Sequence, residues 1–371
     1  MQLDTKTLAA YLSQVEGRPV RIKQVSEIGR AARGATALKA FGYGRPLAIV
    51  YQPLANGSEA VPLAKTRQVV LRRVTKNNFG RERDDDRIAE TWLDFRTFNL
   101  LPHHARVCDM AALTTDGRLE SAAHLRDFFL LTDFVTGSLY ADDLARIRDS
   151  GICTDQDIDR ARTLATYLAE IHAVKFADPT LWRRRLRDLV GHGEGIMGLT
   201  DSYPPTFKLV SGEELRRIEE AANAWRWRLK PLAHRLSQVH GDFHPFNILF
   251  RDGCEFTVLD RSRGEWGEPA DDLSALTMNY LFFALQRYDK LDGPFTDLCK
   301  VFWEHYQELS GDSEISNVIQ PWFAWRALVL ASPQWYPTLS DQVRRALLAF
   351  ARNVLGEQCF AWRQVNDYLK D

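Results

Sequence analysis

One segment, residues 239–272, gathers most of the side chains in this sequence that could carry out chemistry. Its residues, VHGDFHPFNILFRDGCEFTVLDRSRGEWGEPADD, include two histidines, several carboxylates and an asparagine around two runs typical of strands. Three kinds of site could need this combination: a transition-metal cluster, a polar turn over a core, or a site that holds a phosphate and its magnesium ion. The strands decide between them, because they fix which side chains meet.

The two runs, NILF and EFTVLD, predict a β-hairpin. They flank Arg251-Asp252-Gly253, and Asp-Gly between two such runs is a strong hairpin signal. Folding the chain there brings Asn247, at the start of the first strand, beside Asp260, at the end of the second. Asp242 lies in the loop that leads to the same end. Two carboxylates and an amide oxygen are therefore expected to meet.

These oxygen ligands suit Mg²⁺, which keeps several waters and completes its coordination with substrate phosphates. A carboxylate that does not bind the metal could accept the proton of a hydroxyl as that hydroxyl attacks phosphorus. The set therefore predicts phosphoryl transfer. Two alternatives remain open: a polar turn whose side chains cap the backbone, and a metal-dependent hydrolase that uses His240, Asp242 and His244 as zinc ligands.

The order HGDFHPFN, VLD and GEPADDLS resembles the catalytic core of the aminoglycoside phosphotransferase and choline kinase-like family, relatives of protein kinases. The resemblance implies an ATP- and Mg²⁺-dependent kinase that phosphorylates a hydroxyl of a small molecule. It implies that Asp242 is the catalytic base and that Asn247 and Asp260 are magnesium ligands. Asp272 is similar to the acidic residue that braces the loop, and His240 to a structural histidine that bonds loop backbone.

In the N-terminal third, the resemblance implies a cation for the nucleotide phosphates and a helix glutamate that holds it. VVLRRV resembles the family's central strand, with Arg72 at the usual lysine position and Glu90 as the paired glutamate. Arginine keeps the positive charge and adds bidentate geometry. Arg73 is the competing choice, because neighbours on a strand face opposite sides. An ordinary surface ion pair is the alternative for Arg72 and Glu90.

Two further segments are assigned to the nucleotide by the same resemblance. EIGRAARGATALKAF resembles the loop that covers the phosphates, where Gly29 and Gly34 would permit close backbone approach. LLTDFVTG resembles the hinge, where backbone groups of Asp133, Phe134 and Val135 would hydrogen-bond adenine.

The expected fold class is α+β, a bilobal protein-kinase-like fold. The first third has an amphipathic helix from Leu8, a charged helix over 83–101, and a hairpin at Asp116-Gly117. Strands are predicted over 18–28, 35–43, 46–52, 67–74 and 127–135. From Ser138 on, long helices dominate. We therefore expect a small N-terminal sheet lobe with one long helix (1–134) and a larger, mainly helical C-terminal lobe with the catalytic loop and acceptor pocket (135–371).

Charge and cysteine content favour a soluble cytoplasmic protein with a small-molecule partner. Lys and Arg number 48 against 49 Asp and Glu, so nothing attracts the whole surface to nucleic acid or to a membrane. The five cysteines are scattered and odd in number, which favours a reducing compartment. The N-terminus lacks the apolar core of a signal peptide, and no apolar run approaches the roughly 18 residues that span a bilayer.

The acceptor side is rich in arginine rather than acidic. LWRRRLRD carries four arginines at 183–185 and 187, and Arg261 and Arg263 follow Asp260 directly. We therefore expect an acceptor with a carboxylate or phosphate rather than an aminoglycoside, with Arg261, Arg263 and His244 as candidate contacts and residues 191–204 near the pocket. A solvated helix face is the alternative for the arginine run. The alternative function is a nucleotide-binding regulatory protein without transfer activity.

Overall fold

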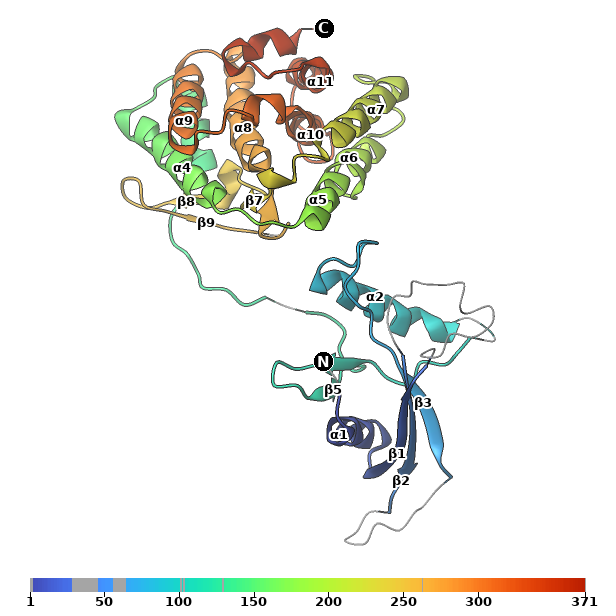
Figure 1. Ribbon diagram of the computed structural model, residues 1–371. Helices are drawn as coiled ribbons and strands as arrows, with labels where there is room; N and C mark the ends of the chain where they lie inside the picture. Colours follow the sequence, from blue (N-terminus) through green and yellow to red (C-terminus); the bar gives the residue numbers. More distant parts are fainter. Residues whose placement is uncertain are drawn as a thin grey trace. The chain divides into compact units, whose positions relative to one another are not determined.

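The computed structural model describes residues 3–28, 46–55, 65–100, 102, 104–128, 130–261 and 263–370. The chain divides into two compact units, Met1–Leu131 and Thr132–Asp371 (Figure 1). The division lies close to the expected boundary between residues 134 and 135. The first unit carries the main sheet and the second is mainly helical, so the α+β class is confirmed.

The first unit is built on an antiparallel sheet of order β1-β2-β3 (Figure 1). β1 (Val20–Glu27), β2 (Leu47–Pro53) and β3 (Arg67–Leu71) confirm three of the strands predicted here. The predicted strand over 35–43 lies outside the described residues. Helix α1 (Thr5–Glu16) buries Leu8 and Leu12, as their helical spacing predicted, and with them Tyr11, in the same apolar cluster as Ile49 and Tyr51 of β2. Val15, which shares that spacing, is exposed.

A second helix and a hairpin complete this unit. Helix α2 (Asp84–Thr97) begins with three aspartates, which suit the positive end of a helix dipole, and a 3₁₀ turn, η2 (Phe98–Leu100), follows it. Strands β4 (Ala111–Leu113) and β5 (Leu119–Ser121) form the hairpin predicted at Asp116-Gly117. Gly117 has φ +85°, the left-handed conformation that such a turn requires.

The buried strand predicted over 127–135 is wrong. The described residues of this segment belong to no strand or helix, and the side chains of Leu130, Leu131 and Phe134 are all more than nine-tenths exposed. An extended run becomes a strand only when a neighbouring strand pairs with its backbone. No described residue does so here, and the first pairing comes at β6 (Ser138–Leu139).

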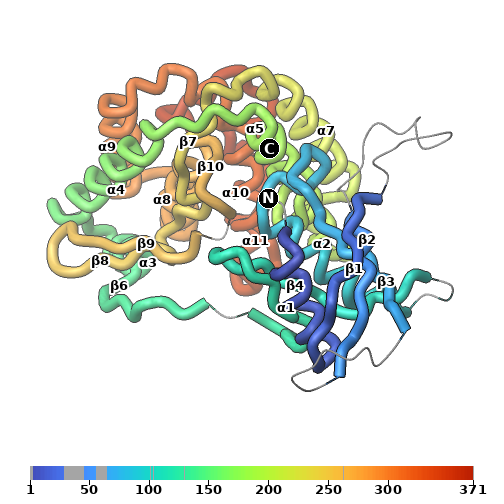
Figure 2. Tube along the Cα trace, turned by 60° about the horizontal axis from the view of Figure 1, so that its bottom comes forward, coloured from blue at the N-terminus to red at the C-terminus, as the bar shows by residue number. Residues whose placement is uncertain are grey.

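The second unit is a helical assembly with short strands, and it confirms the long helices expected there. Helices α4 and α9 lie side by side (Figure 2). The longer helices are α3 (Tyr140–Ser150), α4 (Asp155–Ala173), α5 (Pro179–Gly191), α6 (Ile196–Ser202), α7 (Gly212–Leu229), α8 (Pro269–Tyr288), α9 (Pro294–Ser310), α10 (Gln320–Ala331) and α11 (Asp341–Gly356). Single turns are η3 (Ala233–Arg235), η4 (Pro245–Asn247) and η5 (Ile315–Asn317), and η6 (Trp362–Leu369) ends the described chain.

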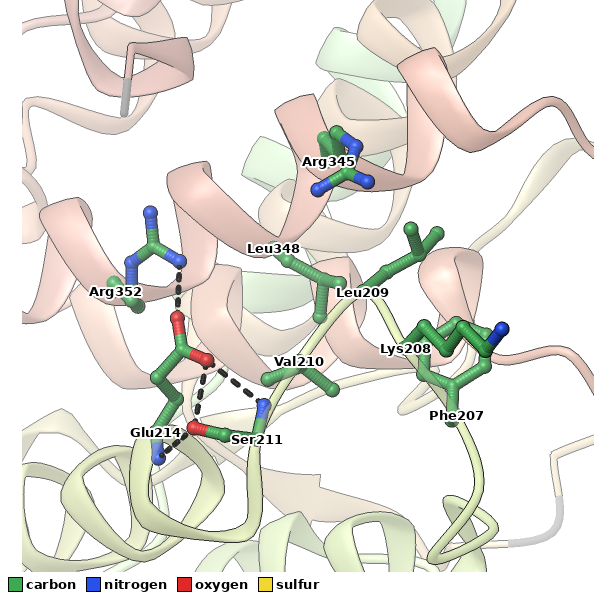
Figure 3. Close-up of a pocket in the computed structure, with 9 residues that line it drawn as sticks. All are labelled: Phe207, Lys208, Leu209, Val210, Ser211, Glu214, Arg345, Leu348 and Arg352. Carbon is green, nitrogen blue, oxygen red and sulfur yellow. Dashed lines mark hydrogen bonds and ion pairs between the residues drawn. The ribbon is translucent and has the colours of Figure 1, made fainter.

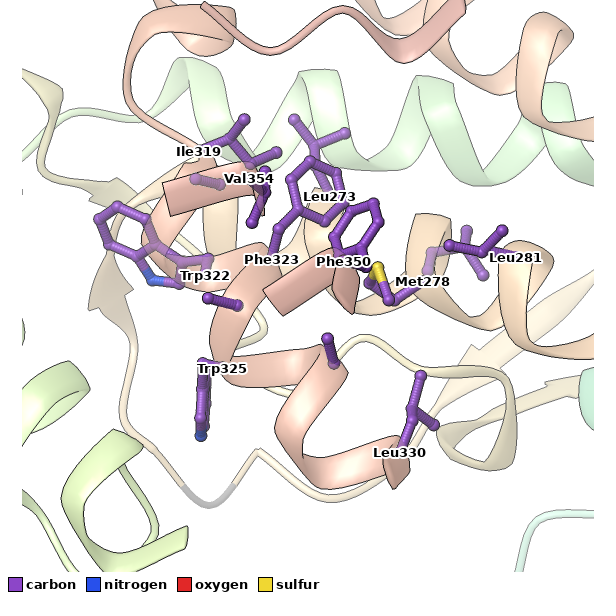
Figure 4. Packing of buried hydrophobic residues seen from close by; sticks show 14 of the residues in the cluster. Leu273, Met278, Leu281, Ile319, Trp322, Phe323, Trp325, Leu330, Phe350 and Val354 are labelled. Atoms are coloured by element: carbon purple, nitrogen blue, oxygen red, sulfur yellow. The ribbon is translucent and has the colours of Figure 1, made fainter. Parts of the chain in front are cut away.

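Helix α8 runs through the centre of this unit, and every residue from Pro269 to Leu285 is buried. Its apolar side chains pack with those of α10 and α11, where the rings of Phe323 and Phe350 meet edge to face at 5.7 Å beside Leu273 (Figure 4). A helix buried on all sides holds its first turn rigidly. The acidic residues at the start of α8 are therefore fixed points for the neighbouring loop.

Five short strands frame that loop. Strand β7 (Ser237–Gln238) pairs with β10 (Trp266–Gly267), while β8 (Ile248–Phe250) pairs with both β6 and β9 (Phe256–Val258). The two-residue strands β6, β7 and β10 are too short to show a periodic pattern, and the sequence did not indicate them. Paired strands therefore flank residues 239–247 at both ends, β7 before them and β8 after them.

All five cysteines are free thiols. Among the described residues, no helix combines the length and the apolar character needed to cross a membrane.

Candidate active site

The first turn of α8 holds the loop that carries Asp242. The Asp272 carboxylate accepts hydrogen bonds from the backbone N–H groups of His240 (2.8 Å) and Gly241 (2.7 Å), and contacts His172 Nε2 at 3.1 Å. Burial alone would raise the pKa of Asp272, but its bonds with His172 and the loop N–H groups outweigh burial and lower it. Asp272 thus makes the bracing contacts expected from the sequence.

Gly241 lets the backbone turn directly before Asp242. Its φ is +86°, and a Cβ there would lie 3.3 Å from Cβ of Arg263. His240 is buried, and its Nδ1 accepts a hydrogen bond from the Asp242 N–H at 3.2 Å. It therefore bonds loop backbone, as the structural interpretation of this histidine expected.

The Asp242 carboxylate is mostly buried, and its two oxygens have different neighbours. Oδ1 forms ion pairs with Arg263 Nη1 (2.7 Å) and Arg326 Nη1 (2.8 Å), whereas Oδ2 lies 3.4 Å from His244 Nε2. Burial would raise the pKa of Asp242, but the hydrogen bond with His244 and the two guanidinium groups hold it well below its usual range. The carboxylate is therefore ionised at neutral pH.

Asn247 lies against the same carboxylate. Its Nδ2 donates to the backbone oxygen of Asp242 at 3.1 Å and lies 3.4 Å from Oδ2. Asn247 closes the 3₁₀ turn η4, whose first residue is Pro245 and whose N-cap is His244. The sequence HPFN therefore folds back on itself and brings two predicted site residues, His244 and Asn247, to Asp242.

The predicted hairpin is confirmed. Ile248 pairs with Val258, and the Leu259 N–H donates to the backbone oxygen of Asn247 at 2.8 Å, so Asn247 and Asp260 lie at the same end. The turn contains more than two residues, because the last hydrogen bond before it joins the Arg251 N–H to the backbone oxygen of Glu255. Asp260 is exposed with φ +53°, and no described residue hydrogen-bonds or pairs with its carboxylate.

The oxygen atoms at this end of the hairpin fit Mg²⁺. Asn247 uses its amide nitrogen toward Asp242, which leaves Oδ1 available, and the Asp260 carboxylate is open to solvent. Magnesium needs only one or two such protein oxygens when waters and phosphates supply the rest. In contrast, the described residues contain no group of three His, Cys, Asp or Glu side chains that could hold a metal, so the zinc interpretation has no geometric support.

Sequence reasoning missed two residues of this site, Arg326 and Asp271. Arg326, on α10, pairs with Asp242 through Nη1 and with Asp271 Oδ1 through Nη2 at 2.7 Å, and both side chains are buried. Asp271 also lies 3.8 Å from Arg185 Nη2, and Arg185 Nη1 donates to the backbone oxygen of Arg263 at 2.8 Å. A signal did exist: Arg326 is the one charged residue in QPWFAWRALVLA, and a buried charge needs a partner.

The two arginines that follow Asp260 have different surroundings. Arg261 donates to the backbone oxygen of Val239 through Nε (3.1 Å) and Nη2 (2.8 Å), so it braces the entry to the loop. Arg263 forms an ion pair with the Asp242 carboxylate through Nη1, and its Nε lies 3.5 Å from the carboxylate of Glu194. Of these two candidates for acceptor binding, Arg263 is the one whose head group reaches the Asp242 carboxylate.

The nucleotide-binding residues predicted in the N-terminal third only partly meet the expected arrangement. Glu90 pairs with Arg81 through both carboxylate oxygens, not with Arg72 as expected, while the Arg72 guanidinium lies 5.7 Å from the ring of Phe98. Arg81 is the nearer arginine along the chain, nine residues from Glu90, and its guanidinium meets both carboxylate oxygens at once. Gly29 and Gly34 lie outside the described residues, and Asp133 and Phe134 belong to the exposed segment that follows the first unit, with Val135 partly covered.

A pocket of about 390 Å³ occurs elsewhere in the second unit, between the segment before α7 and helix α11 (Figure 3). An ion pair of Arg352 with Glu214 spans it, and Glu214 also caps the start of α7 with Ser211. It includes none of the residues around Asp242. Its lining residues are Phe207, Lys208, Leu209, Val210, Ser211, Glu214, Arg345, Leu348 and Arg352.

Three solved structures illustrate what this chain is similar to. A glucosamine kinase in complex with glucosamine, ADP and inorganic phosphate matches at 21% identity and TM-score 0.36, over 62% of this chain and only 57% of that one. An amicoumacin kinase with AMP-PNP, Ca²⁺ and Ami matches at 14% identity and TM-score 0.41, over 85% and 89%. A Plasmodium vivax ethanolamine kinase matches at 12% identity and TM-score 0.32, over 96% and 82%.

A search of curated proteins gives no match. The model of the phosphotransferase enzyme family, however, matches residues 65–297, which is more than half of the chain and includes Asp242, Asn247 and Asp260. The chain therefore belongs to the phosphotransferase enzyme family.

Proposed function

We propose that this protein is a cytoplasmic ATP- and Mg²⁺-dependent kinase that phosphorylates a hydroxyl of a small molecule, with Asp242 as the base. One observation carries the proposal: the first turn of α8 holds the loop of Asp242, and the Asp242 carboxylate lies 3.4 Å from Asn247, at the end of a hairpin that also carries Asp260. Family membership supports the reaction class.

Asp242 is suited to orient an acceptor hydroxyl and receive its proton. Oδ1 is occupied by Arg263 and Arg326, so Oδ2 is the oxygen that faces a hydroxyl. The acceptor oxygen forms a bond to the γ-phosphorus, the bond from that phosphorus to the ADP oxygen breaks, and the hydroxyl proton passes to Asp242. A carboxylate of low pKa is a weak base, so it takes the proton late, as the oxygen develops acidity in a loose transition state.

Asn247 and Asp260 are the proposed magnesium ligands. A bound Mg²⁺ would neutralise charge on the transferred phosphoryl group. This chain's contribution is to hold the two oxygens at one end of the β8–β9 hairpin, beside the base. The hydrogen bond between Leu259 and Asn247 keeps that register.

Contacts with ATP are proposed for Arg72, for the glycine loop with Gly29 and Gly34, and for the backbone of residues 133–135. The pairing of Glu90 with Arg81 separates Glu90 from this set. Arg72 is exposed and makes a described contact only with the ring of Phe98, so its charge can meet a phosphate.

The arginines around Asp242 favour an acceptor with a carboxylate or phosphate group. Three guanidinium groups (Arg185, Arg263 and Arg326) lie in the network around the Asp242 carboxylate, beside the carboxylates of Asp271 and Glu194. Arg263 is the most exposed of the three, at 21% of its side chain. A polycationic aminoglycoside would meet the like charge of the Arg263 guanidinium there.

A regulatory protein that binds nucleotide without transfer is the second candidate. The pairing of Glu90 with Arg81, in place of a phosphate-binding cation, is the observation that favours it. Nucleotide affinity without product formation would be its signature.

A panel of acceptors distinguishes the two. The purified protein is incubated with Mg-ATP and hydroxy acids, sugar phosphates, neutral sugars or amino alcohols, while ADP release and new phosphate esters are followed by a coupled assay and ³¹P NMR. We expect acceptor-dependent ester formation with the highest kcat/KM for anionic alcohols. Higher kcat/KM for cationic alcohols would reject the acceptor assignment, and ATP binding without any ester would favour the regulatory function.

A further inference from the structure

Arg326 lies at the centre of a buried network that no motif indicated. Its side chain is only 8% exposed, in a helix whose other residues are uncharged. One end of the guanidinium pairs with Asp242 and the other with Asp271, and Nη2 lies 3.3 Å from the backbone oxygen of Gly241. It therefore connects α10 with α8 and with the loop that carries the proposed base.

The network closes into a ring around the carboxylate of Asp242. Asp271 contacts Arg185 of α5, Arg185 donates to the backbone oxygen of Arg263, and Arg263 returns to Asp242 Oδ1. Both arginines that reach Asp242 use the same oxygen. The ring therefore fixes the rotation of the carboxylate and leaves Oδ2 on the side of His244 and Asn247.

An aromatic ring holds the two guanidinium groups in place. The Trp325 ring lies 4.1 Å from the Arg326 guanidinium carbon and 4.8 Å from that of Arg263, and its Nε1 donates to the backbone oxygen of Glu194 at 2.7 Å. Stacking on an aromatic face restricts how a planar guanidinium can rotate. The direction of both bonds to Asp242 is therefore set from outside the loop.

Simple stability is a weak reason for this arrangement. Replacing a buried ion pair by apolar side chains of similar volume is often neutral or stabilising, whereas removing one partner alone is strongly destabilising. A cation at position 326 of an otherwise apolar helix thus calls for a reason beyond packing. Control of the orientation of Asp242 is such a reason.

We propose that Arg326 is a positioning residue: it holds Asp242 Oδ1 so that Oδ2 faces the acceptor hydroxyl. This inference rests on the proposed function for its effect on turnover. Its structural part, that Arg326 fixes the rotation of the Asp242 carboxylate, can be tested without measuring activity.

A double-mutant cycle with Asp242 tests the proposal. Lysine keeps the charge of residue 326 but cannot bridge two carboxylates in a fixed plane. Arg326→Lys should lower kcat about 10²-fold, as small misplacements of reacting groups do, with the KM for ATP within about twofold of wild type. In an Asp242→Asn background the same change should cost less than about threefold, because Arg326 acts through Asp242. Equal losses in both backgrounds would overturn the proposal.

A charge-balanced variant covers the case in which Arg326→Lys does not fold. Arg326→Met with Asp271→Asn removes one buried cation and one buried carboxylate, so the net charge of the ring is unchanged. The matched control is Arg235→Met with Glu268→Gln, because Arg235 is 4% exposed and pairs with Glu268 (2.6 Å) and Asp312 (2.7 Å) away from Asp242. The first pair should lose kcat, while the second should lose thermal stability and keep kcat.

A crystal structure of whichever Arg326 variant folds tests the orientation of Asp242 separately from the proposed function. A rotated Asp242 carboxylate is expected, and a carboxylate unchanged from wild type would contradict the positioning role. If wild-type protein forms no phosphate ester with any acceptor, the proposed function fails, while this comparison still decides whether Arg326 orients Asp242.

Discussion

At the scale of single residues, burial and ion pairing act in opposite directions on the pKa of Asp242. Withdrawing a carboxylate from water disfavours its charged form, yet two guanidinium groups and His244 lower its pKa far enough to keep it ionised. An ionised carboxylate can accept a hydrogen bond from a hydroxyl at any physiological pH. The neighbours of Asp242 therefore set its ionisation state.

Arg263 and Arg261 offer a matched pair of substitutions. Arg263→Gln removes a partly exposed cation beside Asp242, so the KM for an anionic acceptor should rise about tenfold or more while the KM for ATP stays unchanged. Arg261→Gln removes bonds to a backbone carbonyl, so it should lower the melting temperature with little change in acceptor preference. Steady-state kinetics and thermal unfolding of both variants check this. A shift in acceptor preference in Arg261→Gln alone would reverse the assignment.

What the sequence could predict at this scale depended on distance along the chain. Asp242, Asn247 and Asp260 lie within one local hairpin and loop, so spacing was enough to bring them together. Arg326 lies 84 residues from Asp242, and only the packing of α10 against the rest of the unit brings it there. Glu90 shows the reverse error, because Arg81, nine residues away, was a nearer partner than the one expected.

At the scale of elements, the β8–β9 hairpin and the first turn of α8 act together. The hairpin aligns Asn247 with Asp260, and Asp272 fixes the loop before it through two backbone hydrogen bonds. The hairpin could be predicted from alternating residues around Asp-Gly. The strand predicted over 127–135 was wrong, because an extended run becomes a strand only with a partner that local sequence does not reveal.

Loss of the hairpin carboxylate should uncouple ATP binding from magnesium. Wild-type protein should bind ATP more tightly with Mg²⁺ than without it. Asp260→Ala should lose most of that difference, because one of two proposed oxygen ligands is gone. Isothermal titration calorimetry with and without Mg²⁺ measures both. Asp252→Ala, in the turn at the opposite end of the hairpin, is the matched control, and an equal loss there would contradict the assignment of Asp260.

The start of α4 should contribute pH-dependent stability. Asp157 is 2% exposed, and burial would raise its pKa, but hydrogen bonds from Thr154 and the pairing with Arg146 lower it. A carboxylate with a lower pKa in the folded state stabilises the fold above its unfolded pKa of about 3.9, and this contribution is lost as pH falls through the folded pKa.

Asp157→Asn should therefore cost about 1.5–3 kcal/mol of unfolding free energy at pH 7, the range for hydrogen bonds to charged groups. Urea unfolding of both proteins should show the difference shrinking below about pH 4. A difference that stays constant down to pH 2, or grows, would exclude this linkage.

At the scale of the whole molecule, the division into a sheet unit and a helical unit could be predicted from the change in local sequence pattern along the chain. Strand-like runs bounded by Gly, Pro and Asn turn signals marked β1, β2 and β3, and long helical patterns marked α1, α4 and α7. The two-residue strands β6, β7 and β10 lacked any pattern, since tertiary contacts alone create them. Family membership then indicates the class of reaction, and experiments have to identify the acceptor.

The most direct test of the central claim compares Asp242→Asn with wild type in ATP affinity and in turnover with the best acceptor. Asparagine keeps the size of the side chain and removes its capacity to take a proton, so ATP affinity should be retained while kcat falls about 10²–10⁴-fold. Equal kcat in the two proteins would contradict the assignment of Asp242 as the base.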